Sequence, residues 1–304
     1  MNRKQSEKWT IFLIVVCLLL AFGLAGLAFG FWNLQSRYED TKKQWEKKEK
    51  EYEQRLKSLE KPGAEPTDES SPAVESDPVA TKLWESLEGV KPGYLVDSEV
   101  LDMADLSKYF NAYSIEEGDA VYQRINGKSY RENPDIGLED LSYLLMLHYD
   151  YEGQIRVGEM IVNKAVEADV RGIFQELFEN QYQIQSMFLV DNYWEVDGTT
   201  ADSISIDNNN TSAFNYRVAT DSDQLSNHAF GRAIDINPLY NPYVLYDDAG
   251  IPIPPYSDEE YNNRATGREI TREGVCYEIF TKYGFTWGGD WVNPIDYQHF
   301  EKRA

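Results

Sequence analysis

One long uncharged run near the N-terminus constrains this sequence more than any other feature. No charged residue occurs between Trp9 and Trp32. As a helix, the run spans about 36 Å, which exceeds the roughly 30 Å of a bilayer's hydrocarbon core. The two tryptophans stand at its ends, where aromatic rings favour the headgroup level. The sequence therefore predicts a transmembrane helix over residues 9–32.

The residues around this run predict its orientation. Basic residues outnumber acidic ones in residues 1–8, so the positive-inside rule places this short N-terminus in the cytoplasm and the remainder outside the cell. A cleaved signal peptide is the alternative, but its apolar core spans only about 7 to 15 residues. We expect a single-pass protein of the cell membrane with an extracellular C-terminal domain.

Two segments of different composition follow the apolar run. Residues 33–60 are highly charged and lack Gly and Pro, which predicts a helical stalk. Apolar residues recur there at intervals of seven, but a second apolar position per heptad is mostly missing, so a coiled-coil homodimer and an isolated helix both stay open. Residues 61–80 are dominated by Pro, Ser and acidic residues. This composition is typical of a disordered linker.

Apolar residues return after the linker and continue to the C-terminus, so residues 81–304 are long enough for one sizeable folded domain. Apolar spacing predicts helices, and one segment fits either a helix or a strand. The helices are expected at Gly137–Tyr149, Ala165–Phe178 and Thr271–Tyr283, with the ambiguous segment at Ile155–Val162.

Short β-prone runs occur in the second half of this domain. They are Ser212–Val218, Ala233–Ile236, Gly284–Trp287 and Tyr297–Phe300. Helices that are grouped early and strands that are grouped late indicate an α+β fold, in which helices pack on a small antiparallel sheet.

Charge and cysteine content exclude several classes of protein. Lys and Arg number 29 against 52 Asp and Glu, a formal net charge of -23. Nonspecific nucleic-acid binding needs clustered Lys and Arg, so no nucleic-acid partner is expected. The only two cysteines are Cys17, in the apolar run, and Cys276, which excludes a disulfide scaffold and a cysteine-rich zinc finger.

The chain has only three histidines, and two of them lie near acidic residues. Catalytic zinc takes three ligands from His, Asp or Glu and keeps one position for water. His228, Asp235 and His299 supply such a set, and Gly231 allows a turn between the first two. Asp296, three residues before His299, is placed to accept a proton from water that the ion activates. Spacing alone does not exclude the alternative that the His–Asp pair has a purely structural role.

Three motifs carry a resemblance to a known family. The segment SNHAFGRAID resembles the S-x-H-x-x-G-x-A-x-D signature of the zinc D-alanyl-D-alanine carboxypeptidase family (VanY-like). The C-terminal GFTWGGDWVNPIDYQHFE is similar to the family's second motif, and residues 210–217 resemble the strand that bears its substrate-clamping arginine. The family has a carboxypeptidase branch and an L-alanyl-D-glutamate endopeptidase branch. The Asp-x-x-His-Phe form and the Gly-Gly-Asp-Trp stretch resemble the endopeptidase branch more than the carboxypeptidase branch, which more often has Glu-x-x-His. The resemblance covers about residues 115–304.

The resemblance implies a role for each matching residue. It makes His228, Asp235 and His299 ligands of Zn²⁺, and it makes Asp296 the general base and later the proton donor to the leaving amine. Arg217 becomes the clamp on the scissile carbonyl, although a surface salt bridge is the alternative. Further substrate contacts are predicted, each with a core or turn role as its alternative. These residues are Ser226, Trp287, Trp291 and Tyr297.

These features together predict a membrane-anchored zinc peptidase that hydrolyses peptidoglycan stem peptides, at the L-Ala–D-Glu bond. Stalk and linker would let the domain reach wall material outside the membrane. A D,D-carboxypeptidase that removes the terminal D-Ala is one alternative. A non-catalytic zinc-containing module that binds wall or regulates a partner is another, although such a module has no need to keep a base and a clamp. His148, in an apolar run, is expected to be a core residue.

Overall fold

The structure is a computed structural model that describes residues 85–219, 222–247, 249–250 and 267–303. All described residues belong to one of the two units into which the chain divides, Val74–Ala304. The predicted transmembrane helix, stalk and linker lie outside the described residues. Within the described ranges, no helix is long and apolar enough to cross a membrane.

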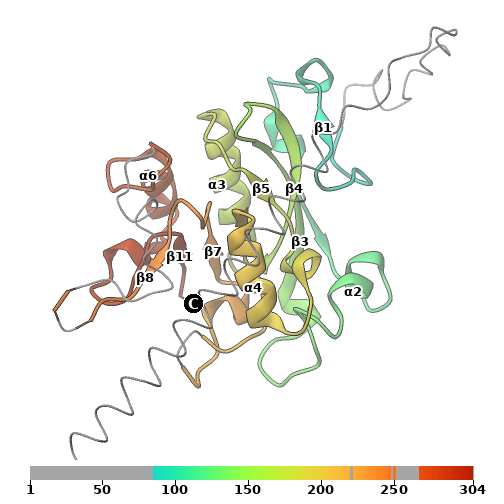
Figure 1. The fold of residues 1–304 in the computed structure, drawn as a ribbon. Helices are drawn as coiled ribbons and strands as arrows, with labels where there is room; N and C mark the ends of the chain where they lie inside the picture. The colour runs from blue at the N-terminus through green and yellow to red at the C-terminus, as the bar shows by residue number, and fades with distance from the viewer. Residues whose placement is uncertain (1–84, 220–221, 248, 251–266, 304) are drawn as a thin grey trace, which may run out of the picture. The chain divides into compact units, whose positions relative to one another are not determined.

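A four-stranded antiparallel sheet forms the centre of the described domain (Figure 1). Its strand order is β1 (Leu95–Val96), β4 (Ile155–Asn163), β3 (Leu141–Tyr149) and β2 (Phe110–Ser114). Strands β3 and β4 form a long hairpin, paired from Leu141 opposite Asn163 to Tyr149 opposite Ile155. This hairpin is almost entirely buried.

Strand β3 overturns one prediction from the sequence. The predicted helix over Gly137–Tyr149 is wrong: a short 3₁₀ helix, η3 (Leu138–Asp140), precedes the strand. All of β3 except its last residue is buried, so both faces require apolar side chains. A continuous apolar run fits a strand buried on both faces as well as a helix. The ambiguous segment at Ile155–Val162 is a strand for the same reason.

The helix predicted over Ala165–Phe178 is confirmed as α3 (Glu167–Glu179). Its buried residues recur at helical spacing and pack on the central sheet through β3 and β2. These residues are Val170, Ile173, Phe174, Leu177 and Phe178. Phe178 stacks on Tyr149, with ring centroids 4.7 Å apart. The core therefore lies between α3 and the long hairpin.

The second half of the chain forms smaller pieces of sheet. A three-stranded antiparallel sheet has the order β7, β11, β9, and two-stranded sheets pair β8 with β10 and β5 with β6. The pair β5–β6 is parallel. Their bounds are β5 Ser186–Met187, β6 Asn210–Thr211, β7 Ala233–Asp235, β8 Tyr243–Val244, β9 Thr286–Trp287, β10 Ile295–Asp296 and β11 His299–Glu301.

Several short helices connect these strands. They are η1 Ser98–Val100, η2 Leu106–Tyr109, α2 Ala120–Ile125, η4 Val190–Tyr193, α4 Gly198–Asp207, η5 Asn227–Phe230, α6 Val275–Lys282 and η6 Gly288–Asp290. The predicted helix at Thr271–Tyr283 is real but begins at Val275, with Gly274 rather than Thr271 as its N-cap. Gly284, with φ of +82°, follows its end as predicted.

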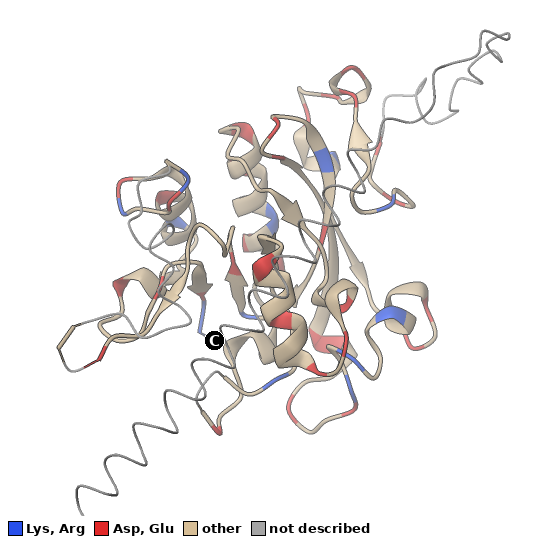
Figure 2. Cartoon of the chain, viewed as in Figure 1, with Lys and Arg blue, Asp and Glu red and all other residues tan. Residues whose placement is uncertain are grey.

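The architecture is a mixture of helices and small, mainly antiparallel sheets, as predicted in outline. The expected order, helices early and strands late, is wrong because the largest sheet comes first in the chain. The β-prone run Ser212–Val218 contributes only isolated bridges, from Ser212 to Asp235 and from Val218 to Leu225. Acidic residues are spread over helices and loops (Figure 2), in keeping with a solvated acidic surface.

Candidate metal centre

A tight turn presents His228 at the edge of the small sheet. His228 lies in η5, whose N-cap Ser226 accepts a hydrogen bond from the His228 backbone N–H at 3.2 Å. Gly231 ends this turn with φ of +63°. A Cβ atom there would lie 2.7 Å from the backbone nitrogen of Asn163. The close approach to β4 and the positive φ both require glycine, and the turn that the sequence predicted at Gly231 is present.

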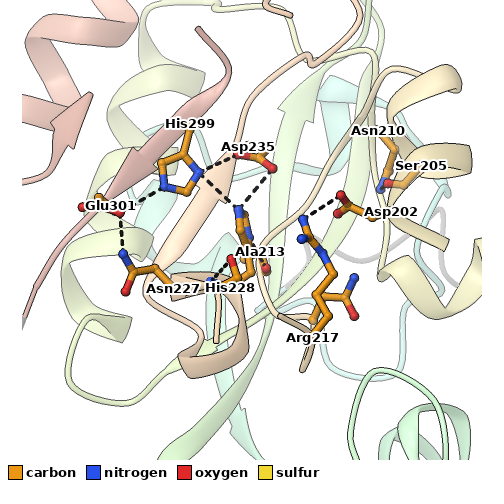
Figure 3. Close-up of polar contacts among 12 residues, drawn as sticks. Asp202, Ser205, Asn210, Ala213, Arg217, Asn227, His228, Asp235, His299 and Glu301 are labelled. Atoms are coloured by element: carbon orange, nitrogen blue, oxygen red, sulfur yellow. Dashed lines mark hydrogen bonds and ion pairs between the residues drawn. The ribbon is translucent and has the colours of Figure 1, made fainter. Parts of the chain in front are cut away.

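The other two predicted ligands face each other across two neighbouring strands. Antiparallel pairing of β7 and β11 sets Asp235 directly opposite His299. Asp235 Oδ1 lies 3.1 Å from His299 Nδ1, and Asp235 Oδ2 lies 3.2 Å from His228 Nε2 (Figure 3). The two ring nitrogens are 3.2 Å apart. All three side chains are buried, and their ligand atoms lie within 4.8 Å of one another.

Further contacts fix which nitrogen each ring directs inward. His228 Nδ1 lies 2.6 Å from the carbonyl oxygen of Ala213, which only accepts, so Nδ1 donates a hydrogen bond to it and Nε2 is the nitrogen that faces Asp235 and His299. His299 Nε2 lies 3.2 Å from Glu301 Oε2, which leaves Nδ1 for the shared centre. Asn227 donates its side-chain N–H to the same Glu301 oxygen. Metal-bound histidines commonly have such outward acceptors.

The electrostatics of this cluster favour a positive charge at its centre. Burial lowers the pKa of His299, but hydrogen bonds to Asp235 and Glu301 outweigh burial and raise the pKa to about 10. Burial raises the pKa of Asp235, but the two histidines outweigh it and hold that pKa well below its usual range. Two imidazoles and one carboxylate are a common ligand set for zinc. The residues present therefore fit a zinc ion.

Glu301 and Asn227 were missed by sequence reasoning. Strand alternation offered a signal, because residues 299 and 301 of β11 lie on the same face of the sheet. A carboxylate two residues after a candidate ligand is therefore placed to contact that ligand's ring. Asn227 offered no comparable signal.

We expect Glu301→Gln to weaken zinc binding by about 10- to 100-fold, the usual effect of losing a carboxylate that orients a metal-bound histidine. Glutamine keeps the size of the side chain but removes its charge. The zinc dissociation constant is measured by competition with a chelator. Glu176→Gln serves as a control, because Glu176 bonds Lys282 and Tyr283 and no predicted ligand. Unchanged affinity in Glu301→Gln would show that Glu301 does not orient His299.

Asp296 lies beside the cluster but on a different sheet. It belongs to β10, which pairs with β8. A Cβ atom on Gly288 would lie 3.0 Å from the Asp296 Cβ and 3.2 Å from the His299 Cβ, so both side chains leave the backbone against this glycine. Burial raises the pKa of Asp296 to about 7; the charge of His299 opposes this shift and that of Asp235 adds to it. Its buried Oδ1 has no hydrogen-bond partner.

Arg217 is held by an ion pair that the sequence did not predict. Its Nη2 lies 2.7 Å from Asp202 Oδ2, and both side chains are largely buried. Its Nη1 donates to the carbonyl oxygen of Val218 at 3.1 Å. Its Nε is buried and has no hydrogen-bond partner. The salt bridge weighed for Arg217 from the sequence is thus present, but it is not a surface one.

The four predicted substrate contacts have different surroundings. Ser226 caps the turn of His228, as described above. Trp287 is only 4% exposed and packs in the core, and its indole N–H donates to the carbonyl oxygen of Tyr297 at 2.8 Å. Tyr297 is half-buried, with its ring 5.9 Å from that of Trp287.

Trp291 is the predicted aromatic contact that combines exposure with closeness to the cluster. It is 37% exposed, and its ring centroid lies 5.3 Å from that of His299. The third histidine, His148, lies on β3 rather than on the expected helix. It is buried in the core as predicted, with Nδ1 2.9 Å from the carbonyl oxygen of Ile184, and burial lowers its pKa to about 4.

The comparison with known families bears on this cluster directly. Residues 219–302 match the sequence profile of a family described as D-alanyl-D-alanine carboxypeptidase. The matched segment contains the three metal-ligand candidates and Asp296, whereas Arg217 lies just before it. No curated protein and no solved structure matches the chain.

This match and the buried His–Asp–His cluster indicate a metallopeptidase whose cofactor is zinc. They support the carboxypeptidase family that the motifs resemble. The matched segment does not distinguish the endopeptidase branch from the rest of the family.

Proposed function

We propose that this chain is a zinc peptidase that hydrolyses peptidoglycan stem peptides at the L-Ala–D-Glu bond. The convergence of His228, Asp235 and His299 on one buried point carries the proposal. The family description supports a peptidoglycan peptide as substrate. The choice of bond is supported by the Asp-x-x-His-Phe and Gly-Gly-Asp-Trp motifs in the sequence.

The chemistry divides between the ion and the side chains around it. Zinc, when bound, supplies Lewis acidity that polarises a carbonyl and acidifies water. Asp296 accepts the proton from the attacking water and returns it to the leaving amine. Arg217 donates N–H groups to the oxygen that becomes negative in the transition state. The buried atoms without partners on both residues, Asp296 Oδ1 and Arg217 Nε, support these roles.

The test is product analysis of wall peptides. The purified full-length chain is incubated with muropeptides, with and without a chelator, and the products are identified by mass spectrometry. We expect chelator-sensitive formation of peptides that begin with D-Glu. Free D-Ala would instead identify the D,D-carboxypeptidase that the family description names. Bound zinc without any cleavage would identify a non-catalytic module.

We also propose that residues 9–32 anchor the domain in the cell membrane, which would hold it near the wall. Removal of residues 1–32 is expected to move the protein from the membrane fraction to the soluble fraction. The uncharged run is separated from the zinc ligands by nearly 200 residues of sequence, so turnover of soluble muropeptides is expected to stay unchanged. Fractionation and kinetics measure both effects. A truncated protein that still sediments with membranes would contradict the anchor.

A further inference from the structure

The ion pair between Arg217 and Asp202 connects helix α4 to the proposed active site. Asp202 lies on α4, whereas Arg217 lies beyond the end of β6, in an irregular segment. The ion pair joins them at 2.7 Å, with side chains 10% exposed for Arg217 and 15% for Asp202. Figure 3 shows the guanidinium group directed toward this carboxylate. The charges of a pair so shielded from solvent are screened much less than those of a surface salt bridge.

Helix α4 is itself firmly held. Asp197 caps its N-terminus by accepting a hydrogen bond from a backbone N–H at 2.8 Å. Asn215, two residues before Arg217, donates to the carbonyl oxygen of Gly198 at 2.9 Å. At the other end of the helix, Asn210 donates to Ser205 Oγ at 2.9 Å. These contacts fix the position of the Asp202 carboxylate, which can therefore orient the flexible side chain of Arg217.

Two of the three guanidinium nitrogens of Arg217 have hydrogen-bond partners, and the third, Nε, is buried without one. Nη2 contacts Asp202 and Nη1 contacts the Val218 carbonyl, whereas Nε has no partner. An unrestrained arginine side chain has many rotamers, and part of this rotamer entropy is lost whenever the side chain must be ordered. Donors that are ordered before the reaction stabilise a developing negative charge most effectively. The two contacts thus order the side chain and leave N–H groups for a substrate.

Asp202 is also close enough to the cluster of candidate metal ligands to interact with the charges of their side chains. Burial raises the pKa of Asp202, the charge of Asp235 raises it further, and the charges of Arg217 and His228 lower it. The ion pair and the ligand cluster therefore belong to one electrostatic environment.

We propose that Asp202 is a positioning residue that holds the Arg217 guanidinium toward the scissile carbonyl. This inference rests on the proposed peptidase function. Asp202 is not among the three candidate metal ligands, and its proposed effect on the reaction passes through Arg217.

The test compares full-length variants by kcat, KM and zinc content. We expect Asp202→Ala to lower kcat by about 100-fold, because small misplacements of a reacting group have effects of this size. KM is expected to change less, and zinc content is expected to stay at the wild-type value. Asp202→Asn retains an oxygen that accepts from Nη2, so it is expected to retain more activity than the alanine variant.

A double variant separates a positioning role from a structural one. Asp202→Ala is expected to cause no further loss of kcat in a protein that already carries Arg217→Ala. The control is Asp150→Asn. Asp150 directly follows β3, and this substitution weakens the ion pair of its buried carboxylate with Arg156 of β4. This control is expected to lower stability without lowering the kcat of the folded protein.

The outcomes distinguish this inference from the proposed function. If the wild type cleaves muropeptides and both Asp202 variants keep its kcat, the inference is wrong and the function stands. Loss of zinc in folded Asp202→Asn, or an additive loss in the double variant, would also overturn the positioning role. A zinc-loaded wild type that cleaves nothing would overturn the function and this inference together.

Discussion

Replacing His299 with alanine is expected to leave the protein without zinc and without peptidase activity. His299 Nδ1 lies 3.1 Å from Asp235 Oδ1 and 3.2 Å from His228 Nε2, and among the described residues these three side chains form the group that could hold a metal ion. Two remaining ligands are too few for the usual protein-bound zinc site. His228→Ala removes the opposite nitrogen and is expected to have the same effect. Elemental analysis after dialysis measures the zinc content of both variants.

The third histidine provides a matched control for this experiment. His148 is as deeply buried as the candidate ligands, but its ring contacts a backbone carbonyl in the core. His148→Gln is expected to lower stability while the folded fraction keeps its zinc. Full zinc occupancy in His299→Ala or in His228→Ala would contradict the ligand assignment.

Replacing Asp296 with asparagine is expected to keep zinc and to lower kcat by about 10²- to 10⁴-fold, the range of general acid–base catalysis. Asparagine preserves the size and the hydrogen bonding of the side chain but cannot accept the proton. The three ligand candidates are untouched, so zinc content is expected to stay at the wild-type value. KM is expected to change less than kcat. Steady-state kinetics and elemental analysis provide the two measurements.

Two results would contradict the role of Asp296. A near-normal kcat in Asp296→Asn at neutral pH would mean that another group is the base. Loss of zinc would mean that Asp296 is a ligand and that its role must be exchanged with that of Asp235. Asp290→Asn is the control, since Asp290 forms an ion pair with Arg272, a residue whose side chain is largely exposed. This control is expected to retain both zinc and activity.

The site was easier to predict from the sequence than the central sheet. His228 and Asp235 lie in one short sequence motif, and His299 lies in a second one. The strands that carry Asp235 and His299 are neighbours in the small sheet, which brings the two motifs together. The run Leu141–Tyr149 was misassigned because burial on both faces removes the alternation that identifies a strand. The ligand residues could be predicted because local motifs contain them, whereas this strand could not, because its apolar run has no local signal that separates a strand from a helix.

Contacts between distant segments explain most of what the sequence could not provide. Asp202 meets Arg217 only because α4 folds against the segment that follows β6, and no spacing rule relates the two positions. Trp287 was predicted as a substrate contact with a core role as its alternative, and packing against Phe300 and Tyr277 places it in the core. The transmembrane helix, the stalk and the linker lie outside the described residues and stay predictions.

The pairing of β7 with β11 makes the ion a cross-link as well as a cofactor. Asp235 and His299 are 64 positions apart in the chain, and the sheet that joins them is built from strands of only two or three residues. Sheets of this size contribute little stability alone. Metal at a thousand times its dissociation constant adds about 4 kcal/mol to the native state. Zinc supply would thus govern how long the protein survives proteases, in addition to how fast it works.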